Sequence, residues 1–87
     1  MMTKIKRPAC RVRGKVYAAP KPGMRHVEVI AHFGLPAKAD RGFVTTAGEF
    51  VGRVEGAKIA IAAGQVPGTV TRLHSEDLPE YKQRHGK

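Results

Sequence analysis

The sequence predicts a small α+β domain, in which a small antiparallel sheet packs against two helices. Two observations support this fold class. Segments with strand-like and helix-like patterns follow one another in the order strand, helix, hairpin, helix, short strand. The chain also has only 87 residues, of which 41% are hydrophobic and 11 are alanine. A single thin core is therefore expected, and a large internal cavity for a cofactor is not.

The N-terminal segment divides into two parts. Residues 1–8 predict a flexible basic arm, because they are mostly polar and close with Pro8. From residue 9 to residue 19, apolar and basic side chains alternate with the period of two that is expected of a half-buried strand. Gly14 interrupts this strand as a bulge or bend, and residues 20–23, which hold two prolines and a glycine, end it in a turn.

A first helix is predicted over residues 24–33. Apolar Val27 and Ile30 recur at helical spacing, and Gly34 follows at the position where a left-handed residue commonly ends a helix. The proline-containing segment 35–41 predicts a loop that leads into the middle of the chain.

The middle of the chain predicts a β-hairpin. Residues 42–46 and 49–52 are β-prone runs, and the pair Ala-Gly at 47–48 separates them as a turn, although Asn-Gly would form a better one. Phe43 and Phe50 are the expected core anchors of this hairpin.

A second helix is predicted over residues 53–63 and ends at Gly64. Gly56 inside it costs about 1 kcal/mol relative to alanine, and the alanine-rich composition suits close approach to the sheet. After a Pro-Gly loop at 65–69, residues 70–73 predict a short strand.

The end of the domain predicts a short helical turn. Ser75 is placed as its N-cap, and Glu76 and Asp77 are favoured near the positive end of the helix dipole. The single domain is therefore expected to span residues 9–78, and residues 79–87 are expected to form a polar C-terminal tail.

The positive charge is concentrated at the N-terminus. The formal net charge is +9, and the first 25 residues carry eight bases and no acid. A one-sided field of this kind attracts nucleic-acid phosphate, an acidic protein surface or an anionic membrane. The membrane is disfavoured because no apolar run approaches ~20 residues and the N-terminal stretch lacks the apolar segment of a secretory signal. A cytoplasmic location is expected, and the single Cys10, which is expected to be partly buried, fits a reducing compartment.

The basic segment is the strongest functional signal. Arg11, Arg13 and Lys15 are spaced by two, so within one strand they would form a row about 6 to 7 Å apart on one face. Tyr17 on the same face could stack on an exposed base. The full predicted set for contact with a partner or with phosphate is Lys4, Lys6, Arg7, Arg11, Arg13, Lys15, Lys21 and Arg25. The alternative is that these charges only protect an edge strand from sheet-to-sheet association.

The chain offers little for catalysis or cofactors. No spacing among the hydroxyl, thiol, histidine and acidic residues singles out a catalytic triad. His26 and His32 are six residues apart and do not form a metal pair on one helix face; a surface or capping role is expected. His74 beside Ser75 to Asp77 is the one compact polar cluster, and a helix start explains it. No glycine-rich nucleotide loop is present, so ATP and NAD are not expected as cofactors. A metal is not expected either, because the histidines lack the spacing of metal ligands.

One stretch resembles a known group of proteins. Its residues are Gly42-Phe43-Val44-Thr45, Gly48-Glu49-Phe50-Val51, Arg53-Val54-Glu55-Gly56-Ala57, Ile59-Ala60, Ala63-Gly64-Gln65 and Leu73-His74-Ser75-Glu76-Asp77-Leu78. They resemble a family of short, functionally uncharacterised proteins from tailed phages and prophages, in which an alanine occupies the place of Gly56. The resemblance covers about 37 residues and implies a mobile-element origin. It also implies an anti-defence role, including an anti-CRISPR role, since small phage accessory proteins commonly bind and disable host machinery.

Three functions follow as hypotheses. The leading one is a non-enzymatic phage accessory protein that binds a host defence or nucleoprotein complex through its basic surface. The alternative is a module that binds DNA or RNA through the backbone, without sequence specificity. The third is a small hydrolase built around His74 and Asp77.

Overall fold

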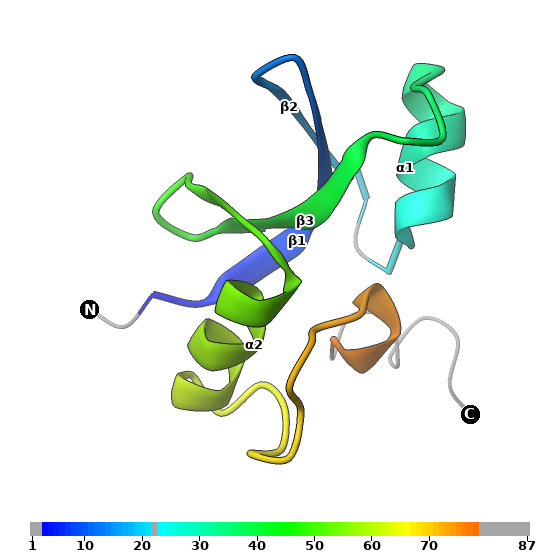
Figure 1. Ribbon diagram of the computed structural model, residues 1–87. Coiled ribbons are helices and arrows are strands. Elements are labelled where there is room, and N and C mark those ends of the chain that lie inside the picture. Colours follow the sequence, from blue (N-terminus) through cyan, green and yellow to red (C-terminus); the bar gives the residue numbers. More distant parts are fainter. Residues whose placement is uncertain (1–2, 22, 79–87) are drawn as a thin grey trace.

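The computed structural model describes residues 3–21 and 23–78 of the chain (Figure 1). The predicted tail at 79–87, the first two residues of the predicted arm and Pro22 of the predicted turn lie outside the described residues. In chain order the elements are β1 (Ile5–Val12), β2 (Lys15–Ala18), α1 (His26–Phe33), β3 (Asp40–Thr45), β4 (Phe50–Val51), α2 (Arg53–Ala62) and the 3-10 helix η1 (Ser75–Asp77). The α+β fold class is confirmed.

The four strands form one antiparallel sheet in the order β2-β1-β3-β4. The predicted strand at 9–19 is in fact two strands, because the chain reverses direction at Arg13-Gly14 and β2 returns alongside β1. Period-two alternation continues across such a turn, so the pattern alone could not locate the reversal.

The first strand also begins earlier than the sequence predicts. β1 starts at Ile5, which is 2% exposed, and Pro8 is buried, so Ile5–Pro8 belong to the sheet and not to a flexible arm. The side-chain amide of Gln65 fixes this end: the Ile5 N–H donates to Oε1 and Nε2 donates to the Ile5 carbonyl, both at 2.9 Å. A register shift between Ile5 and Arg7 marks a bulge at Lys6.

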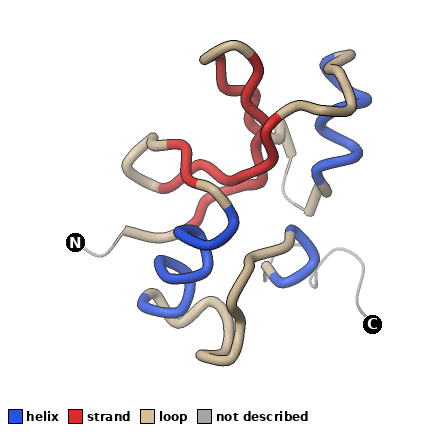
Figure 2. Tube along the Cα trace, viewed as in Figure 1, coloured by secondary structure: helices blue, strands red, loops and turns tan. Residues whose placement is uncertain are grey.

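The predicted strand at 70–73 is wrong: this segment is a loop (Figure 2). Leu73 is fully buried, but its backbone N–H donates to the Arg53 carbonyl at the start of α2, at 3.0 Å. The apolar residues that suggested a strand therefore pack on the second helix and make no pairing with the sheet.

α1 ends at the predicted residue, and α2 ends one residue earlier than predicted, at Ala62. Gly34 after α1 and Gly64 after α2 have φ of 65° and 74°, the left-handed conformation that glycine adopts at low cost. α1 begins at His26, two residues later than predicted, and the Arg25 N–H donates to Glu28 Oε1 at 2.7 Å. This bond satisfies one of the donors that a helix start leaves free.

The predicted central hairpin is confirmed as β3 and β4, but its turn and one of its expected anchors differ. The Thr45 N–H donates to the Glu49 carbonyl at 2.9 Å, so the loop is the three residues 46–48 and not the pair 47–48. Phe43 is fully buried, whereas Phe50 is only partly buried and does not belong to the buried core.

Gly42 in β3 is buried, and a Cβ at this position would meet the Val51 carbonyl and come within 2.6 Å of the Phe50 ring. A glycine is therefore required where the Phe50 ring folds over the sheet. Gly56 in α2 is less constrained, since a Cβ there would lie 3.3 Å from Phe43, a tight contact that a small shift of the ring relieves.

Two apolar clusters pack on the face of the sheet that the helices cover. The α2 cluster consists of Ile5, Phe43, Ala57, Ala60, Val66, Leu73 and Leu78. The α1 cluster consists of Cys10, Ala19, Met24 and Val29. Phe43 and Cys10 project from the same sheet face, because alternate residues of β1 and β3 share a face in the observed register. The clusters meet at His26, whose ring lies edge-on to Phe43 with centroids 5.0 Å apart.

Candidate cationic cleft

The tip of the first hairpin carries the candidate site. β1 and β2 are joined by the two-residue turn Arg13-Gly14, and both residues have positive φ, 51° and 81°. This geometry is typical of a type I′ hairpin turn. Glycine adopts it freely, whereas Arg13 holds a left-handed conformation that costs about 1 kcal/mol or more. The hairpin thus keeps a long cationic side chain where asparagine or glycine would be more stable.

The turn overturns the predicted row of Arg11, Arg13 and Lys15 on one strand face. In the observed register Arg11 lies opposite Val16, and Val12 lies opposite Lys15. Since cross-strand partners project to the same face, Arg11 and Lys15 project to opposite faces of the hairpin. The three charges are instead gathered around its tip.

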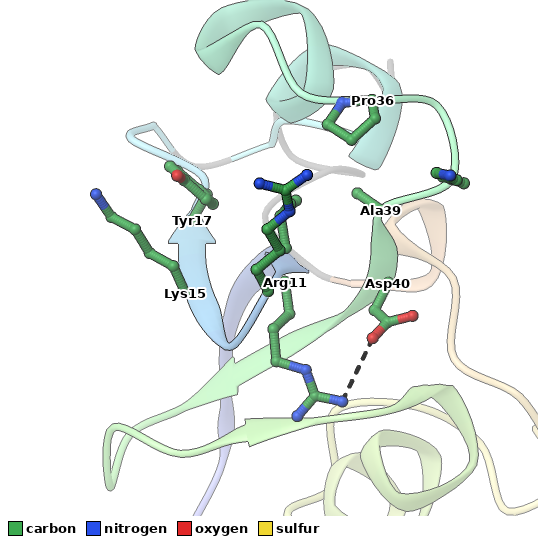
Figure 3. A pocket seen from close by; sticks show the side chains of 9 residues that line it. Arg11, Lys15, Tyr17, Pro36, Ala39 and Asp40 are labelled. Atoms are coloured by element: carbon green, nitrogen blue, oxygen red, sulfur yellow. Dashed lines mark hydrogen bonds and ion pairs between the residues drawn. The ribbon is translucent and has the colours of Figure 1, made fainter.

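An open cleft of about 700 Å³ lies between the hairpin tip and the loop that leads into β3 (Figure 3). We call it the cationic cleft. Its lining consists of Arg11, Val12, Arg13, Lys15, Tyr17, Pro36, Lys38, Ala39 and Asp40. Four of these side chains are cationic and one is acidic, and the others supply apolar and aromatic surface. The cleft therefore suits an anionic partner that also offers apolar contacts.

Tyr17 forms the aromatic part of the cleft. Its ring centroid lies 5.3 Å from that of Phe33 in α1, and the Nζ of Lys15 lies 5.3 Å from the Tyr17 ring centroid. Packing on α1 fixes the tyrosine, which is partly buried. The stacking of a base on Tyr17 stays a prediction.

Arg11 is held by two contacts. Its Nη2 lies 3.5 Å from Asp40 Oδ2, and its guanidinium carbon lies 4.7 Å from the ring centroid of Phe50. The two side chains of the ion pair are 46% and 66% exposed, so solvent screens the pair and it contributes less than about 1 kcal/mol. Its main effect is to orient the arginine, while Asp40 offsets part of the positive charge.

Three residues of the predicted contact set are exposed but do not line the cleft. They are Lys4, Lys6 and Lys21. Lys4 directly precedes β1 and Lys6 is its second residue, so both lie at the other end of the strand from the hairpin tip. These lysines extend the positive field without forming part of the cleft.

Two further members of the predicted set have structural partners. Arg7 Nη1 donates to the Ala19 carbonyl at 3.2 Å and ties β1 to the segment after β2. Arg25 Nη1 lies 3.9 Å from Glu76 Oε2, which links the start of α1 to η1. Neither residue lines the cationic cleft.

Lys38 and Asp40 are cleft residues that sequence reasoning missed. They lie in and just after the loop at 35–39, and pairing of β1 with β3 places them opposite the hairpin. This pairing joins segments about thirty residues apart, as in the partners Arg11 and Asp40. The local sequence carries no signal for it.

His26 is buried, so the expectation of a surface position is wrong. It is 3% exposed, and its Nε2–H donates to the Gly42 carbonyl at 2.7 Å. Burial lowers the pKa of His26, and the charges of Arg53 and Arg41 lower it further. The Gly42 hydrogen bond and the Glu76 carboxylate act in the opposite direction.

The Cys10 thiol is fully buried. Burial raises its pKa, and the charges of Arg41 and Arg53 oppose the shift only in part. The thiol stays protonated near neutral pH and packs as a small apolar side chain.

The polar cluster at His74 to Asp77 forms a helix start, as predicted, but with a different cap. His74 occupies the N-cap position and its backbone N–H donates to Asp77 Oδ2 at 3.0 Å. Ser75, the predicted cap, is the first residue of η1 and is buried, with its Oγ 3.4 Å from Glu76 Oε1. Within residues 3–21 and 23–78, no three His, Cys, Asp or Glu side chains are grouped as metal ligands would be.

Comparison with known proteins gives one family. No curated protein and no solved structure matches the chain significantly. In the part of the chain that the structure describes, no helix has the length and apolar character needed to cross a membrane. A family described as phage T4 y16D protein matches residues 5–78, from the first residue of β1 to the residue after η1. The match extends well beyond the segment at 42–78 that carries the sequence resemblance and takes in the cationic cleft. The chain belongs to the phage T4 y16D protein family.

Proposed function

We propose that this chain is a non-enzymatic phage accessory protein that binds an anionic surface of a host nucleoprotein complex. The observation that carries the proposal is the cationic cleft, where four bases and one acid surround a partly apolar floor. The sequence resemblance adds the kind of target, a host defence complex such as a CRISPR effector. Action on such a complex takes place in the cytoplasm of the host bacterium.

The charges and the shape of the cleft suit docking on a large partner. A cluster of like charges at an exposed hairpin tip speeds encounter with an oppositely charged surface. Tyr17, Val12 and Pro36 add contact area that excludes water once the partner is bound. Binding of this kind would act by occlusion and needs no chemistry from the chain.

The positions of the nucleophile candidates support a role without catalysis. The Cys10 thiol and the Ser75 side chain are both buried, and Ser75 lies in the capping cluster of η1. A hydrolase built on His74 and Asp77 would require Asp77 to act as an acid or base, whereas its carboxylate accepts the His74 backbone N–H.

A second candidate is direct binding of DNA or RNA without sequence specificity. The observation that favours it is the proximity of Lys15 to the Tyr17 ring, which places a phosphate-binding cation beside a base-stacking surface. The two candidates differ in their response to salt. Several phosphate contacts make affinity fall by orders of magnitude between low and moderate salt, whereas apolar anchors on a protein keep it.

The test is a pull-down from a bacterial host lysate with the tagged protein, with and without nuclease. The proposal expects a defined protein complex to be retained after nuclease at moderate salt. Retention of nucleic acid alone, and only without nuclease, would replace the proposal with the second candidate.

Charge reversal identifies the surface. The double variant Arg13→Glu with Lys38→Glu should abolish retention, because it reverses two charges on opposite sides of the cleft. The matched control, Lys58→Glu with Arg72→Glu, changes the net charge equally at exposed positions outside the cleft. If the control lost binding to the same degree, the general positive charge and not the cleft would be responsible.

A further inference from the structure

A second polar pocket lies between the two helices, away from the cationic cleft. It holds about 150 Å³ and its lining includes Arg25, His26, Arg41, Arg53, Ser75 and Glu76. These residues come from the start of α1, the beginning of β3, the start of α2, and η1. The pocket therefore lies where η1, in the orange segment of Figure 1, comes near the starts of both helices.

The charge in this pocket is unbalanced. Three guanidinium groups face one carboxylate, and that carboxylate, on Glu76, lies 3.9 Å from Arg25. Among the residues that the structure describes, Arg41 and Arg53 form no ion pair. Three guanidinium groups against one carboxylate leave the pocket with two positive charges in excess.

Arg53 supplies a second and independent observation. Its Nε is buried and has no hydrogen-bond partner among the described residues. A buried donor without an acceptor costs about 1 to 3 kcal/mol, and more when the group is charged. Buried polar groups are satisfied in the great majority of cases, so the guanidinium group of Arg53 lacks the partner that a charged group normally has. Because Nε itself is buried, an anion in the pocket would act on the charge of Arg53 through the part of the guanidinium group that is accessible.

The positive charges of Arg41 and Arg53 also act on two neighbouring titratable groups, His26 and Cys10. The charges of Arg41 and Arg53 lower the pKa of His26 and also act to lower the pKa of Cys10, which lies across the sheet from Arg41. Arg41 of β3 and Arg53 of α2 both line the pocket together with His26, so two guanidinium groups on different elements lie near the His26 ring.

We propose that this pocket binds a phosphate group that carries two negative charges, as free phosphate or as the terminal phosphate of a nucleic-acid strand. A dianion balances the excess charge, which a carboxylate or a phosphodiester with one negative charge does not. Guanidinium groups bind phosphate oxygens through paired hydrogen bonds. The pocket, at about 150 Å³ and open on one side to solvent, has room for a phosphate group.

The inference is independent of the proposed function, because the cationic cleft shares none of the residues that form this pocket. It concerns one compact anion, whereas the cleft suits an extended anionic surface.

The test is a titration of the 15N-labelled full chain with inorganic phosphate, followed by NMR at pH about 8 and constant ionic strength, where the dianion predominates. The expected result is saturable shifts at Arg25 to Val27, Arg41, Arg53 and Ser75. A further readout is the His26 ring, which lines the pocket and whose resonances should shift with the same saturation curve. Shifts without saturation, or shifts equally large around Arg13 and Lys15, would overturn the proposal.

Two variants test the arginines. Arg53→Gln and Arg41→Gln should each weaken phosphate binding about tenfold or more, since each removes a charged hydrogen-bond donor. The matched control Arg72→Gln removes an exposed arginine outside the pocket and should leave affinity unchanged. Arg41 is exposed, so its variant is expected to fold even if Arg53→Gln does not. Wild-type affinity in a folded Arg41→Gln protein would overturn the proposal.

Two further probes define the ligand. Acetate at the same ionic strength should bind at least about tenfold more weakly than phosphate, and equal binding would reduce the pocket to a general anion site, against the proposal. A trinucleotide with a 5′-phosphate is compared with the same trinucleotide without it. Binding of the phosphorylated form alone assigns the pocket to a strand terminus, and binding of inorganic phosphate but neither trinucleotide assigns it to free phosphate.

Discussion

The α2 cluster and the α1 cluster cover the same sheet face but bury different amounts of apolar surface. The α2 cluster contains Ile5, Phe43, Leu73 and Leu78, all at most 2% exposed. The α1 cluster relies on Val29, Met24 and small side chains such as Cys10. The larger cluster draws on segments from both ends of the described chain, whereas the smaller one joins α1 to the first hairpin.

Most of the buried apolar contacts lie away from the cationic cleft. The cleft is built on the half with the smaller cluster, from the hairpin tip and the loop after α1. Regions with few buried apolar contacts open more readily than the rest of a fold. We therefore expect the α2 half to hold the fold together while the α1 half adjusts to a partner.

The largest expected effect is that of Phe43→Ala. Phe43 is fully buried in the α2 cluster and also contacts His26, so its removal leaves a cavity at the junction of the two clusters. The free energy of unfolding should fall by about 3 to 5 kcal/mol, measured by urea denaturation. The control Phe33→Ala, at a position 39% exposed, should cost about 1 kcal/mol. Equal losses would contradict the assignment of the main core to the α2 half.

A smaller loss of stability is expected from Val29→Ala, which weakens the α1 cluster. Val29 is fully buried in the α1 cluster, and its truncation should cost about 2 kcal/mol. Hydrogen exchange should accelerate in α1 and β2 more than in α2 and β3, because only the smaller cluster is weakened. Val54→Ala serves as the control, since Val54 is 51% exposed on α2. Uniform acceleration across the sheet would show that the two halves open as one unit.

His26 links the halves and gives them a common dependence on pH. Its pKa in the folded chain is lowered below the ordinary 6.5, so the unfolded chain binds more protons as the pH falls through that value. The free energy of unfolding should therefore decrease as the pH falls below about 6.5. His26→Gln should remove most of this slope, whereas His32→Gln, at an exposed position, should retain it. An unchanged slope in His26→Gln would assign the pH dependence to another group.

The smallest expected effect is a gain in stability at the hairpin tip. Arg13→Asn should raise the free energy of unfolding by about 0.5 to 1 kcal/mol, because asparagine tolerates the left-handed conformation that Arg13 holds. The same variant should weaken retention of the host complex. The control Gly14→Ala should instead lower the free energy of unfolding. A Cβ at Gly14 meets no atom within 4 Å, but φ is +81°, so backbone strain alone should destabilise the hairpin. Full retention by a stabilised Arg13→Asn protein would remove Arg13 from the binding surface.

Features set by a few neighbouring residues could be predicted from the sequence. The ends of both helices follow from Gly34 and Gly64, whose conformation is a local property. The central hairpin likewise follows from two β-prone runs around Gly48. Where tertiary contacts decide the structure, the predictions were wrong: Ile5 is fixed by Gln65, and Leu73 packs on α2.

In the candidate site, too, the sequence predicts the residues but not their arrangement in space. The charges of Arg11, Arg13 and Lys15 could be identified from the sequence, and all three line the cleft. Their arrangement depends on the reversal at Gly14, and the contribution of Lys38 depends on the pairing of β1 with β3. Neither is a property of the local sequence.

The central position of β1 bears on how the chain folds as it is synthesised. β1 leaves the ribosome before the other three strands of this sheet, yet it lies inside the sheet and needs β3, which ends at Thr45, as its second neighbour. Until then the nascent chain holds only the β1–β2 hairpin, and an isolated hairpin is marginally stable. At about 5 to 20 residues per second, the 33 residues from Val12 to Thr45 take several seconds to add. During this interval one edge of β1 remains open to other strands in the cell.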